Sequence, residues 1–187
     1  RGSLLGSCCH TIFEHLMPNS RRYKYNAITQ HPASIRHSPA INRYVKSYVK
    51  KYQLDDEAFD MIDAMVLVGL SYDFYCEKGQ GVELEAEKKF DIELSDPKCR
   101  ITGLIDKMAA YPKKGLIRVV DYKSNKRKYE GDDLEDNIQA QMYSVAAKHM
   151  HPDLQPIVEF IFLQFPDSPV QRLSFDEADL RKFKDYL

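Results

Sequence analysis

The sequence lacks three features that would place it in a class immediately. It has no apolar stretch long enough to cross a bilayer, no signal peptide, and no excess of charge of either sign. Its 27 Lys and Arg residues nearly cancel its 28 Asp and Glu residues. Net charge therefore argues neither for nor against a nucleic-acid partner, and any basic surface must be local. We expect a cytoplasmic protein with no membrane partner.

Cysteine is also scarce, and its placement indicates no special chemistry. The four cysteines, Cys8, Cys9, Cys76 and Cys99, show no pair with the spacing of a metal site. Neighbours such as Cys8 and Cys9 rarely bridge each other. Reduced thiols in a cytoplasmic protein are the simplest account.

Apolar residues are plentiful enough for one core. With 187 residues and 43% hydrophobic content, a single domain over 1–187 is expected. The polar segment 18–39 predicts a loop or lid with little regular structure, so that 18–54 forms a loop and helical insertion. We expect Gly79 and Gly81 to end the helix before them. Helical spacing of apolar residues predicts helices over 5–16, 40–52, 55–77 and 134–150.

Between residues 82 and 123 the period of the apolar residues changes to two. This alternation predicts three strands in an antiparallel meander, over 82–94, 100–108 and 116–123. Asp96-Pro97 is the expected turn between the first two strands.

The C-terminal part predicts two more strands and a helix. The dense apolar run 157–165 is typical of a buried strand, and 170–175 of an edge strand. Asp176 is a plausible N-cap for a final helix, whose pattern stops at Leu187 and leaves room for a native C-terminus further on. The whole order is an α-rich N-terminal part followed by βββαβ, which predicts a mixed α/β fold with helices packed on a central sheet.

Two of the predicted strands end in an acid. Asp106 follows Gly103-Leu-Ile, and Asp121 follows Val-Val and precedes Tyr122-Lys123. Side chains alternate along a strand, so Asp121 and Lys123 share one face. Two carboxylates brought together repel unless a cation lies between them, and a divalent cation with a lysine could position a water for hydrolysis of a phosphodiester. The alternative is a surface ion pair between Lys123 and Asp121, worth almost nothing.

Polar pairs one turn apart mark two of the predicted helices. His10 and Glu14 share a face of the first helix, and Gly6, one turn earlier, permits close approach of another backbone. A lone helical histidine is more often a surface or core residue than a ligand. Gln139 and Tyr143 form a similar pair, for which an ordinary half-buried helix face is the simpler interpretation.

Basic and aromatic residues interleave in three places, 21–25, 46–52 and 126–129. Such clusters suit a phosphate backbone whose bases stack on the rings. A solvated helix face explains 46–52 equally well. The candidate DNA-binding residues are Arg21, Arg22, Lys24, Lys126, Arg127 and Lys128.

Together these residues resemble the RecB-type branch of the PD-(D/E)xK nuclease superfamily. Five segments match the family's motifs in order: Gly6-x-x-x-His10-x-x-x-Glu14, Glu87-Lys-Lys-Phe90, Gly103-Leu-Ile-Asp106, Val120-Asp121-Tyr122-Lys123-Ser124-Asn125 and Gln139-Ala-Gln-Met-Tyr143. The resemblance implies a restriction-endonuclease-like α/β core of order αβββαβ, with a central mixed sheet flanked by helices.

The resemblance also implies roles at the matching positions. Mg²⁺ or Mn²⁺ would be bound by His10, Asp106, Asp121 and the backbone carbonyl of Tyr122. Lys123 would orient the attacking water and offset transition-state charge, while Gln139 and Tyr143 would support the site or the DNA strand. Glu87 and Glu14 are candidate additional acids, and for Glu87 the alternation puts Glu83 and Glu85 on the same strand face.

The chain departs from several relatives that carry an iron–sulfur cluster. Their cluster uses one N-terminal cysteine and a C-terminal cysteine trio, whereas this sequence has no cysteine after Cys99. We therefore expect no iron–sulfur cluster within this chain, unless a trio follows Leu187. The phosphate-binding Gly-x-x-x-x-Gly-Lys-Ser/Thr loop of helicases is absent too, so unwinding would need a helicase or recombination partner.

The sequence thus predicts a metal-dependent DNA nuclease, an exonuclease serving recombination, repair or phage-type DNA processing. Two alternatives stay open. One is a nucleic-acid-binding or partner-docking module that keeps the fold without catalysis. The other is a site-specific endonuclease, whose base-reading element could come only from 18–52.

Overall fold

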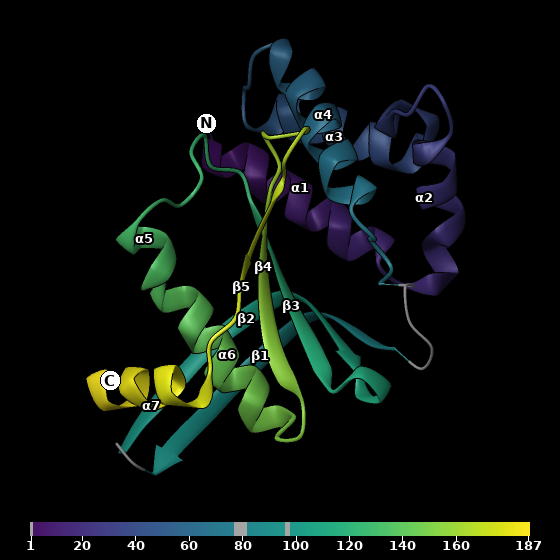
Figure 1. Ribbon diagram of the computed structural model, residues 1–187. Coiled ribbons are helices and arrows are strands. Elements are labelled where there is room, and N and C mark those ends of the chain that lie inside the picture. Colours follow the sequence, from purple (N-terminus) through teal and green to yellow (C-terminus); the bar gives the residue numbers. More distant parts are fainter. Residues whose placement is uncertain (1, 77–81, 96–97) are drawn as a thin grey trace. The chain divides into compact units, whose positions relative to one another are not determined.

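The computed structural model describes residues 2–76, 82–95 and 98–187 (Figure 1). Its contacts divide the chain into two compact units, and each unit combines three segments of sequence. We call them the helical unit and the sheet unit. The helical unit comprises Arg1–Tyr75, Tyr122–Lys126 and Ile161–Pro169, and the sheet unit Cys76–Asp121, Arg127–Phe160 and Val170–Leu187. The expectation of a single domain stays a prediction.

The helical unit is built on its first and fourth α-helices. Helix α1 buries Leu5, Cys9, Ile12 and Leu16 along one face, which is the stripe that the sequence predicts. It packs against α4 at Gly69, where a Cβ atom would collide with the ring of Phe13. The α-helices of this unit are α1 (Gly2–Leu16), α2 (Arg22–Thr29), α3 (Pro39–Lys51) and α4 (Glu57–Ser71), with short 3-10 turns η1 (Asn19–Arg21) and η2 (Ile35–His37) between them.

The prediction of little regular structure over 18–39 is wrong, because α2 and both 3-10 turns lie there. Helix α2 has few apolar residues, but Ile28 is fully buried. The ring of Tyr25 stacks on Phe74, with 5.7 Å between the ring centroids, and meets Tyr75 edge-on. Packing against residues almost fifty positions away therefore stabilises a helix that the local sequence does not predict.

Helix α4 ends at Ser71, six residues earlier than predicted. Asp73 has a φ of 40°, a left-handed conformation that cannot continue a helix. The hydroxyl of Tyr75 then donates to the carbonyl of Leu16 and fixes this turn against α1. The predicted stop at Gly79 and Gly81 lies outside the described residues.

The strands form one five-stranded mixed sheet in the order β1-β2-β3-β4-β5 (Figure 1). Its first three strands pair antiparallel, which confirms the predicted meander. Hydrogen bonds run from Gln155 N to Gly115 O and from Leu163 N to Lys123 O. The residue numbers rise together along both strands, so β4 runs parallel to β3. The strands are β1 (Glu83–Ser95), β2 (Lys98–Tyr111), β3 (Leu116–Lys123), β4 (Gln155–Phe162) and β5 (Val170–Leu173). The predicted Asp96-Pro97 turn lies outside the described residues.

The single helix predicted over 134–150 is two helices, α5 (Asp132–Glu135) and α6 (Ile138–Met150). Asn137 separates them, because its side chain accepts from Ala140 N and caps α6. Helix α6 packs on β1 and β2 and contacts the last helix, α7 (Glu177–Tyr186). Asp176 caps α7 as predicted, in a reciprocal capping box with Asp179.

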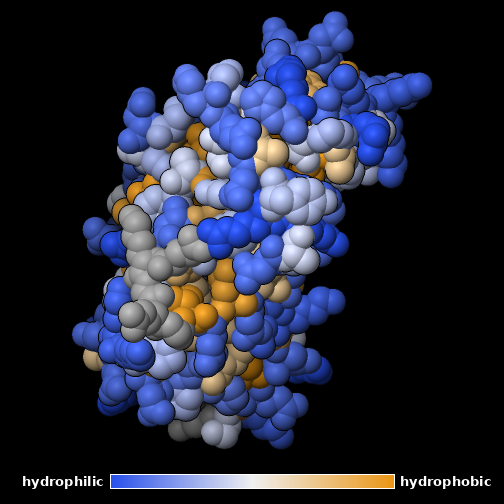
Figure 2. Space-filling model, turned by 90° about the vertical axis from the view of Figure 1, so that its right-hand side faces the viewer, coloured by the Kyte–Doolittle hydropathy of each residue, from blue (hydrophilic) through white to orange (hydrophobic). Residues whose placement is uncertain are grey.

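The described residues include no helix long and apolar enough to span a membrane. The face shown in Figure 2 is mainly hydrophilic, with small groups of hydrophobic atoms between the polar side chains. The mixed α/β fold predicted from the sequence, with helices on a mixed sheet, is confirmed.

Candidate active site

Asp106 and Asp121 occupy neighbouring strands at one level of the sheet. The β2–β3 ladder ends with Lys107 opposite Val120, so the next position along each strand is one of the two acids. Both carboxylates act on the same phenol, because their negative charges help to raise the pKa of Tyr143. The sheet unit thus brings the two acids together, but the prediction that Asp106 ends its strand is wrong, because β2 continues to Tyr111.

Glu87 on β1 stands at the same level, opposite Asp106. The ladder pairs the residues on either side of Glu87 with the residues on either side of Asp106, but it skips this pair. The φ of Glu87 is 49°, a left-handed conformation that is costly for a residue with a side chain. The strand therefore carries a kink directly across from Asp106.

The pairing of β1 with β2 keeps the same register on both sides of the kink. Glu85 and Lys88, which a regular strand would point to opposite faces, form an ion pair. The expectation that Glu83, Glu85 and Glu87 share one face stays a prediction. Distortions of this kind are common beside active sites, where they change the direction of a side chain.

Asp121 is held by two side chains of α6. It is only 5% exposed. Its Oδ1 atom lies 2.8 Å from Tyr143 Oη and 3.1 Å from Gln139 Nε2, and 2.8 Å separate Gln139 Nε2 from Tyr143 Oη. Both donors approach the same carboxylate oxygen and stabilise its charged form. The one-turn spacing of Gln139 and Tyr143 thus aims both side chains at one acid.

Tyr143 remains a proton donor in this position. Burial, and then the charge of Asp121, raise the pKa of its hydroxyl well above the ordinary range. The Tyr143 hydroxyl also lies 3.0 Å from the carbonyl oxygen of Leu104, two residues before Asp106. One phenol therefore connects the strands that carry the two acids.

In the helical unit, His10 reaches the segment that follows Asp121. Its Nε2 lies 3.0 Å from the carbonyl oxygen of Tyr122, the carbonyl predicted to be a metal ligand. The Tyr122 ring packs on Phe13, with 4.3 Å between centroids. At Gly6, one turn before His10, a Cβ atom would collide with the side chain of Ser124. The close approach expected at Gly6 is thus to the residues after β3.

The predicted site residues are divided between the two units. Asp106, Asp121, Gln139 and Tyr143 belong to the sheet unit, and His10, Tyr122 and Lys123 to the helical unit, so the Asp121–Tyr122 peptide bond joins the two groups. Lys123 is the half-buried last residue of β3.

The remaining predicted residues are more exposed. Glu14, a candidate additional acid, is exposed on α1. Lys126 and Arg127 are exposed in the loop after β3, and Lys128 is half-buried. The guanidinium of Arg22 lies 4.6 Å from the centre of the Tyr75 ring. The other two candidates, Arg21 and Lys24, are half-buried beside His15.

The donor types in this region suit a hard divalent cation. Carboxylates and a backbone carbonyl are the oxygen ligands that Mg²⁺ and Mn²⁺ prefer, and imidazole is acceptable to Mn²⁺. Within residues 2–76, 82–95 and 98–187, no three His, Cys, Asp or Glu side chains are gathered closely enough to form a metal-binding group.

The cysteines are free thiols. Cys8 and Cys9 are fully buried in α1. Burial raises the pKa of Cys8 to about 12 and that of Cys9 well above its ordinary value. Both are therefore protonated thiols near neutral pH.

Sequence reasoning missed a buried charge network in the sheet unit. Glu159 is fully buried in β4 and forms ion pairs with Arg118 on β3 and Arg172 on β5. The signal was an acid inside the apolar run 155–162, where a charge is tolerated only with partners. These two ion pairs tie three strands together.

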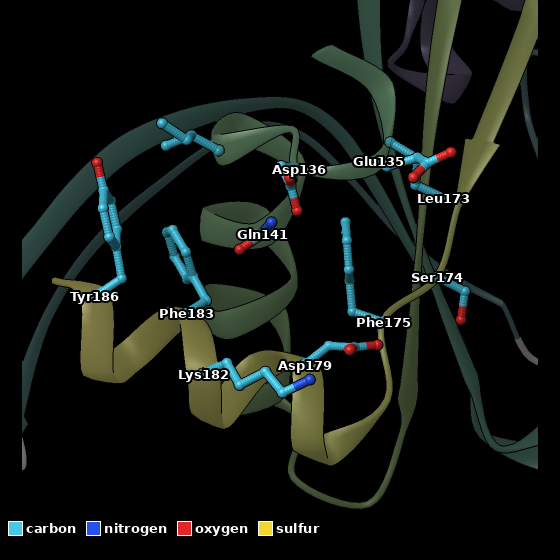
Figure 3. A pocket seen from close by; sticks show the side chains of 11 residues that line it. Glu135, Asp136, Gln141, Leu173, Ser174, Phe175, Asp179, Lys182, Phe183 and Tyr186 are labelled. Carbon is cyan, nitrogen blue, oxygen red and sulfur yellow. The ribbon is translucent and has the colours of Figure 1, made fainter. Parts of the chain in front are cut away.

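A pocket of about 710 Å³ lies in the sheet unit, between the start of α6 and α7 (Figure 3). The rings of Phe175, Phe183 and Tyr186 line it, and Gln141 points into it. Gln139, two residues earlier, bonds to Asp121 instead. The predicted catalytic residues do not line this pocket.

Comparison with known proteins agrees with this arrangement at the level of the family. A family model described as the PD-(D/E)XK nuclease superfamily matches residues 2–187. A search of curated proteins finds no match. Among solved structures, protein VC1899 from Vibrio cholerae is similar over 97% of this chain, at 9% sequence identity and a TM-score of 0.36. The present chain covers 50% of the length of that protein.

Proposed function

Because the chain belongs to the PD-(D/E)XK nuclease superfamily, we propose that it is a metal-dependent deoxyribonuclease that acts as an exonuclease. The observation that supports this most strongly is the pair Asp106 and Asp121 on neighbouring strands, with Asp121 held by Tyr143 and Gln139. Lys123 follows two residues later on β3. A surface ion pair would need none of the hydrogen bonds that α6 provides to Asp121.

In this proposal Asp106, Asp121, the carbonyl of Tyr122 and His10 hold Mg²⁺ or Mn²⁺. The metal supplies an activated water and stabilises negative charge on the phosphate. His10 Nε2 lies 3.0 Å from the carbonyl oxygen of Tyr122, so that these two proposed ligands are close to each other. The choice between the two metals is set by availability and by the imidazole, which Mg²⁺ accepts poorly.

The other residues position these groups. Lys123 brings a positive charge to the end of β3, where it orients the attacking water and offsets the charge that develops on the phosphate. Gln139 and Tyr143 donate hydrogen bonds to Asp121 and fix the direction of its carboxylate. Lys126, Arg127 and Lys128 continue from β3 as contacts for the DNA backbone, and Glu87 is a further acid beside Asp106. Recombination, repair or phage-type DNA processing, with unwinding by a partner helicase, is the setting that we propose.

The experiment uses an end-labelled linear DNA and a closed circular DNA, each with Mg²⁺, Mn²⁺ or EDTA. We expect loss of the linear DNA alone, only with metal, and none with Asp121→Ala. Asp133→Ala, which removes an exposed acid of α5, is the matched control and should be fully active. Cleavage of the circle would instead indicate an endonuclease. Binding of DNA without cleavage in every metal would contradict the proposal and favour a binding module.

A further inference from the structure

His15, at the C-terminal end of α1, is placed between two cations of the residues that follow. Its Nδ1 atom lies 2.9 Å from Arg21 Nη1, and its Nε2 atom lies 2.8 Å from Lys24 Nζ. The same Arg21 nitrogen also donates to the backbone carbonyl of His15, at 3.1 Å. All three side chains are half-buried in the helical unit.

This cluster contains more hydrogen-bond donors than acceptors. A neutral imidazole has one acceptor nitrogen and one N–H, whereas guanidinium and ammonium groups only donate. One ring nitrogen of His15 therefore presents an N–H to a cation. In the described part of the chain, neither Arg21 nor Lys24 forms an ion pair with a carboxylate. The charge of Glu14 nevertheless lies near enough to influence His15. Such a cluster has the composition of an anion site.

The local electrostatics agree with this composition. Burial lowers the pKa of His15 below its ordinary value, and the positive charges of Lys24 and Arg21 lower it further. An anion placed among the three groups would reverse the effect of those two charges. It would also accept the hydrogen bonds that the cations now direct at one imidazole ring.

We propose that His15, Arg21 and Lys24 form a phosphate-binding subsite that holds one backbone phosphate of the nucleic-acid strand. Tyr23, between the two cations, is 66% exposed, and Lys24 Nζ lies 5.8 Å from the centre of its ring. An exposed ring beside a phosphate site can stack on a base, which favours a nucleic-acid strand over a free anion. The identity of the ligand rests on the proposed function, whereas the anion site itself rests on the geometry of the three side chains.

The first test observes the His15 ring in the intact protein by nitrogen-15 NMR. Sodium phosphate is added at constant ionic strength, with sodium chloride as the reference. We expect a saturable shift of both ring nitrogens of His15 with phosphate, together with a rise in the pKa of His15. A response no larger than that to chloride would overturn the subsite, whatever the nuclease assay shows.

The second test measures binding of single-stranded DNA against salt in Asp121→Ala, which binds without cutting. Adding Arg21→Gln and Lys24→Gln should weaken binding and reduce the slope of log Kd against log salt by about 0.7, the effect of one lost phosphate contact. Arg181→Gln, an exposed cation on α7, is the control and should leave the slope unchanged.

The two proposals can fail separately. A phosphate response at His15 without cleavage of any DNA by the wild-type protein would keep the subsite and refute the nuclease. Cleavage by the wild-type protein, together with an unchanged salt slope in the double glutamine variant, would keep the nuclease and refute the subsite. Circular dichroism of that variant shows whether it folds, and if it does not, the NMR titration of the wild-type protein decides.

Discussion

At the scale of single residues, Tyr143 is the side chain on which the candidate site depends most. Its hydroxyl lies within hydrogen-bond distance of Asp121, Gln139 and the carbonyl of Leu104. Its ring also meets Phe90 edge-on, with 6.3 Å between centroids. The hydroxyl and the ring therefore have separable contributions, to the site and to the core.

Tyr143→Phe removes the hydroxyl and keeps the ring. We expect the free energy of unfolding to fall by about 1.5–3 kcal/mol, the usual contribution of a hydrogen bond to a charged group. The cleavage rate should fall by more than this loss of stability explains, because Asp121 loses a donor that fixes its direction. Urea unfolding and single-turnover cleavage measure the two effects. A variant with wild-type cleavage would show that Tyr143 has no positioning role.

The residues of this site differ in how far sequence alone could find them. Asp106 and Asp121 are visible because each closes an apolar run, which is a local signal, although β2 continues past Asp106. The partnership of Asp121 with Gln139 and Tyr143 joins residues 18 and 22 positions apart. Only the resemblance to a family, and not the helical spacing of the pair, suggested it. His15 carried no signal, because η1 and α2, which carry its partners Arg21 and Lys24, were not predicted from the sequence.

At the scale of elements, β1 stores strain at the one residue that faces Asp106. The alternating sequence of β1 favours a regular strand throughout, so no local pattern predicts the left-handed φ of Glu87. Glu87, Asp106 and Asp121 stand at one level of the sheet. The role of Glu87 therefore has two explanations: its carboxylate acts in the site, or its backbone bend sets the position of Asp106.

Glu87→Gly and Glu87→Ala distinguish these explanations. Both remove the carboxylate, but only glycine adopts a positive φ without strain, so the glycine variant should be more stable by roughly 1 kcal/mol in urea unfolding. If the carboxylate acts in the site, both variants lose cleavage equally. Cleavage retained by the glycine variant alone would assign the role to the backbone. Equal stability of the two variants would contradict the strain that the geometry indicates.

Helix α1 offers a similar comparison at its contact with Ser124. A Cβ at Gly6 collides with that side chain, whereas a Cβ at Gly2 meets nothing within 4 Å. Gly6→Ala should destabilise the protein by up to about 2 kcal/mol, since overpacking outweighs the better helix propensity of alanine. Gly2→Ala, the matched control, should be neutral or slightly stabilising. Thermal unfolding measures both, and adding Ser124→Gly to Gly6→Ala should restore stability; no restoration would show that the collision is not the cause.

Boundaries at this scale were predictable where the signals are local. Strand β3 follows the predicted bounds to the residue, because a turn precedes it and polar residues follow it. Helix α2 was missed because its stabilising contacts are to the distant rings of Phe74 and Tyr75. The break before α6 was also missed, although Asn137 is a typical N-cap, because the apolar pattern runs through it.

At the scale of the whole molecule, the two units are interleaved along the chain. The chain passes between them within β3, at the Asp121–Tyr122 bond, and again within β4, between Phe160 and Ile161. Both strands begin in the sheet unit, and their last residues belong to the helical unit. Unfolding of either unit must therefore disturb a strand that both share, so we expect the chain to unfold cooperatively.

Alkaline pH tests the whole molecule, because buried acidic groups of both units are kept protonated. Burial raises the pKa of Cys8 and of Tyr48 in the helical unit to about 12, and that of Tyr111 in the sheet unit to about 12. In the unfolded chain these groups ionise at about 8.5 for cysteine and about 10 for tyrosine. Their contribution to stability is thus complete below about pH 8.5 and is lost as the pH rises toward 12.

We therefore expect the free energy of unfolding to fall steadily from pH 8.5 upward in urea titrations. Cys8→Ala should flatten the first part of this fall, between the unfolded pKa of a thiol and that of a phenol. Tyr111→Phe should flatten the later part. Cys99→Ala, which removes a half-buried thiol on β2, is the matched control for the first variant. A profile that stays level from pH 8.5 to 11 in the wild-type protein would mean that these groups ionise as readily in the folded protein as in the unfolded chain.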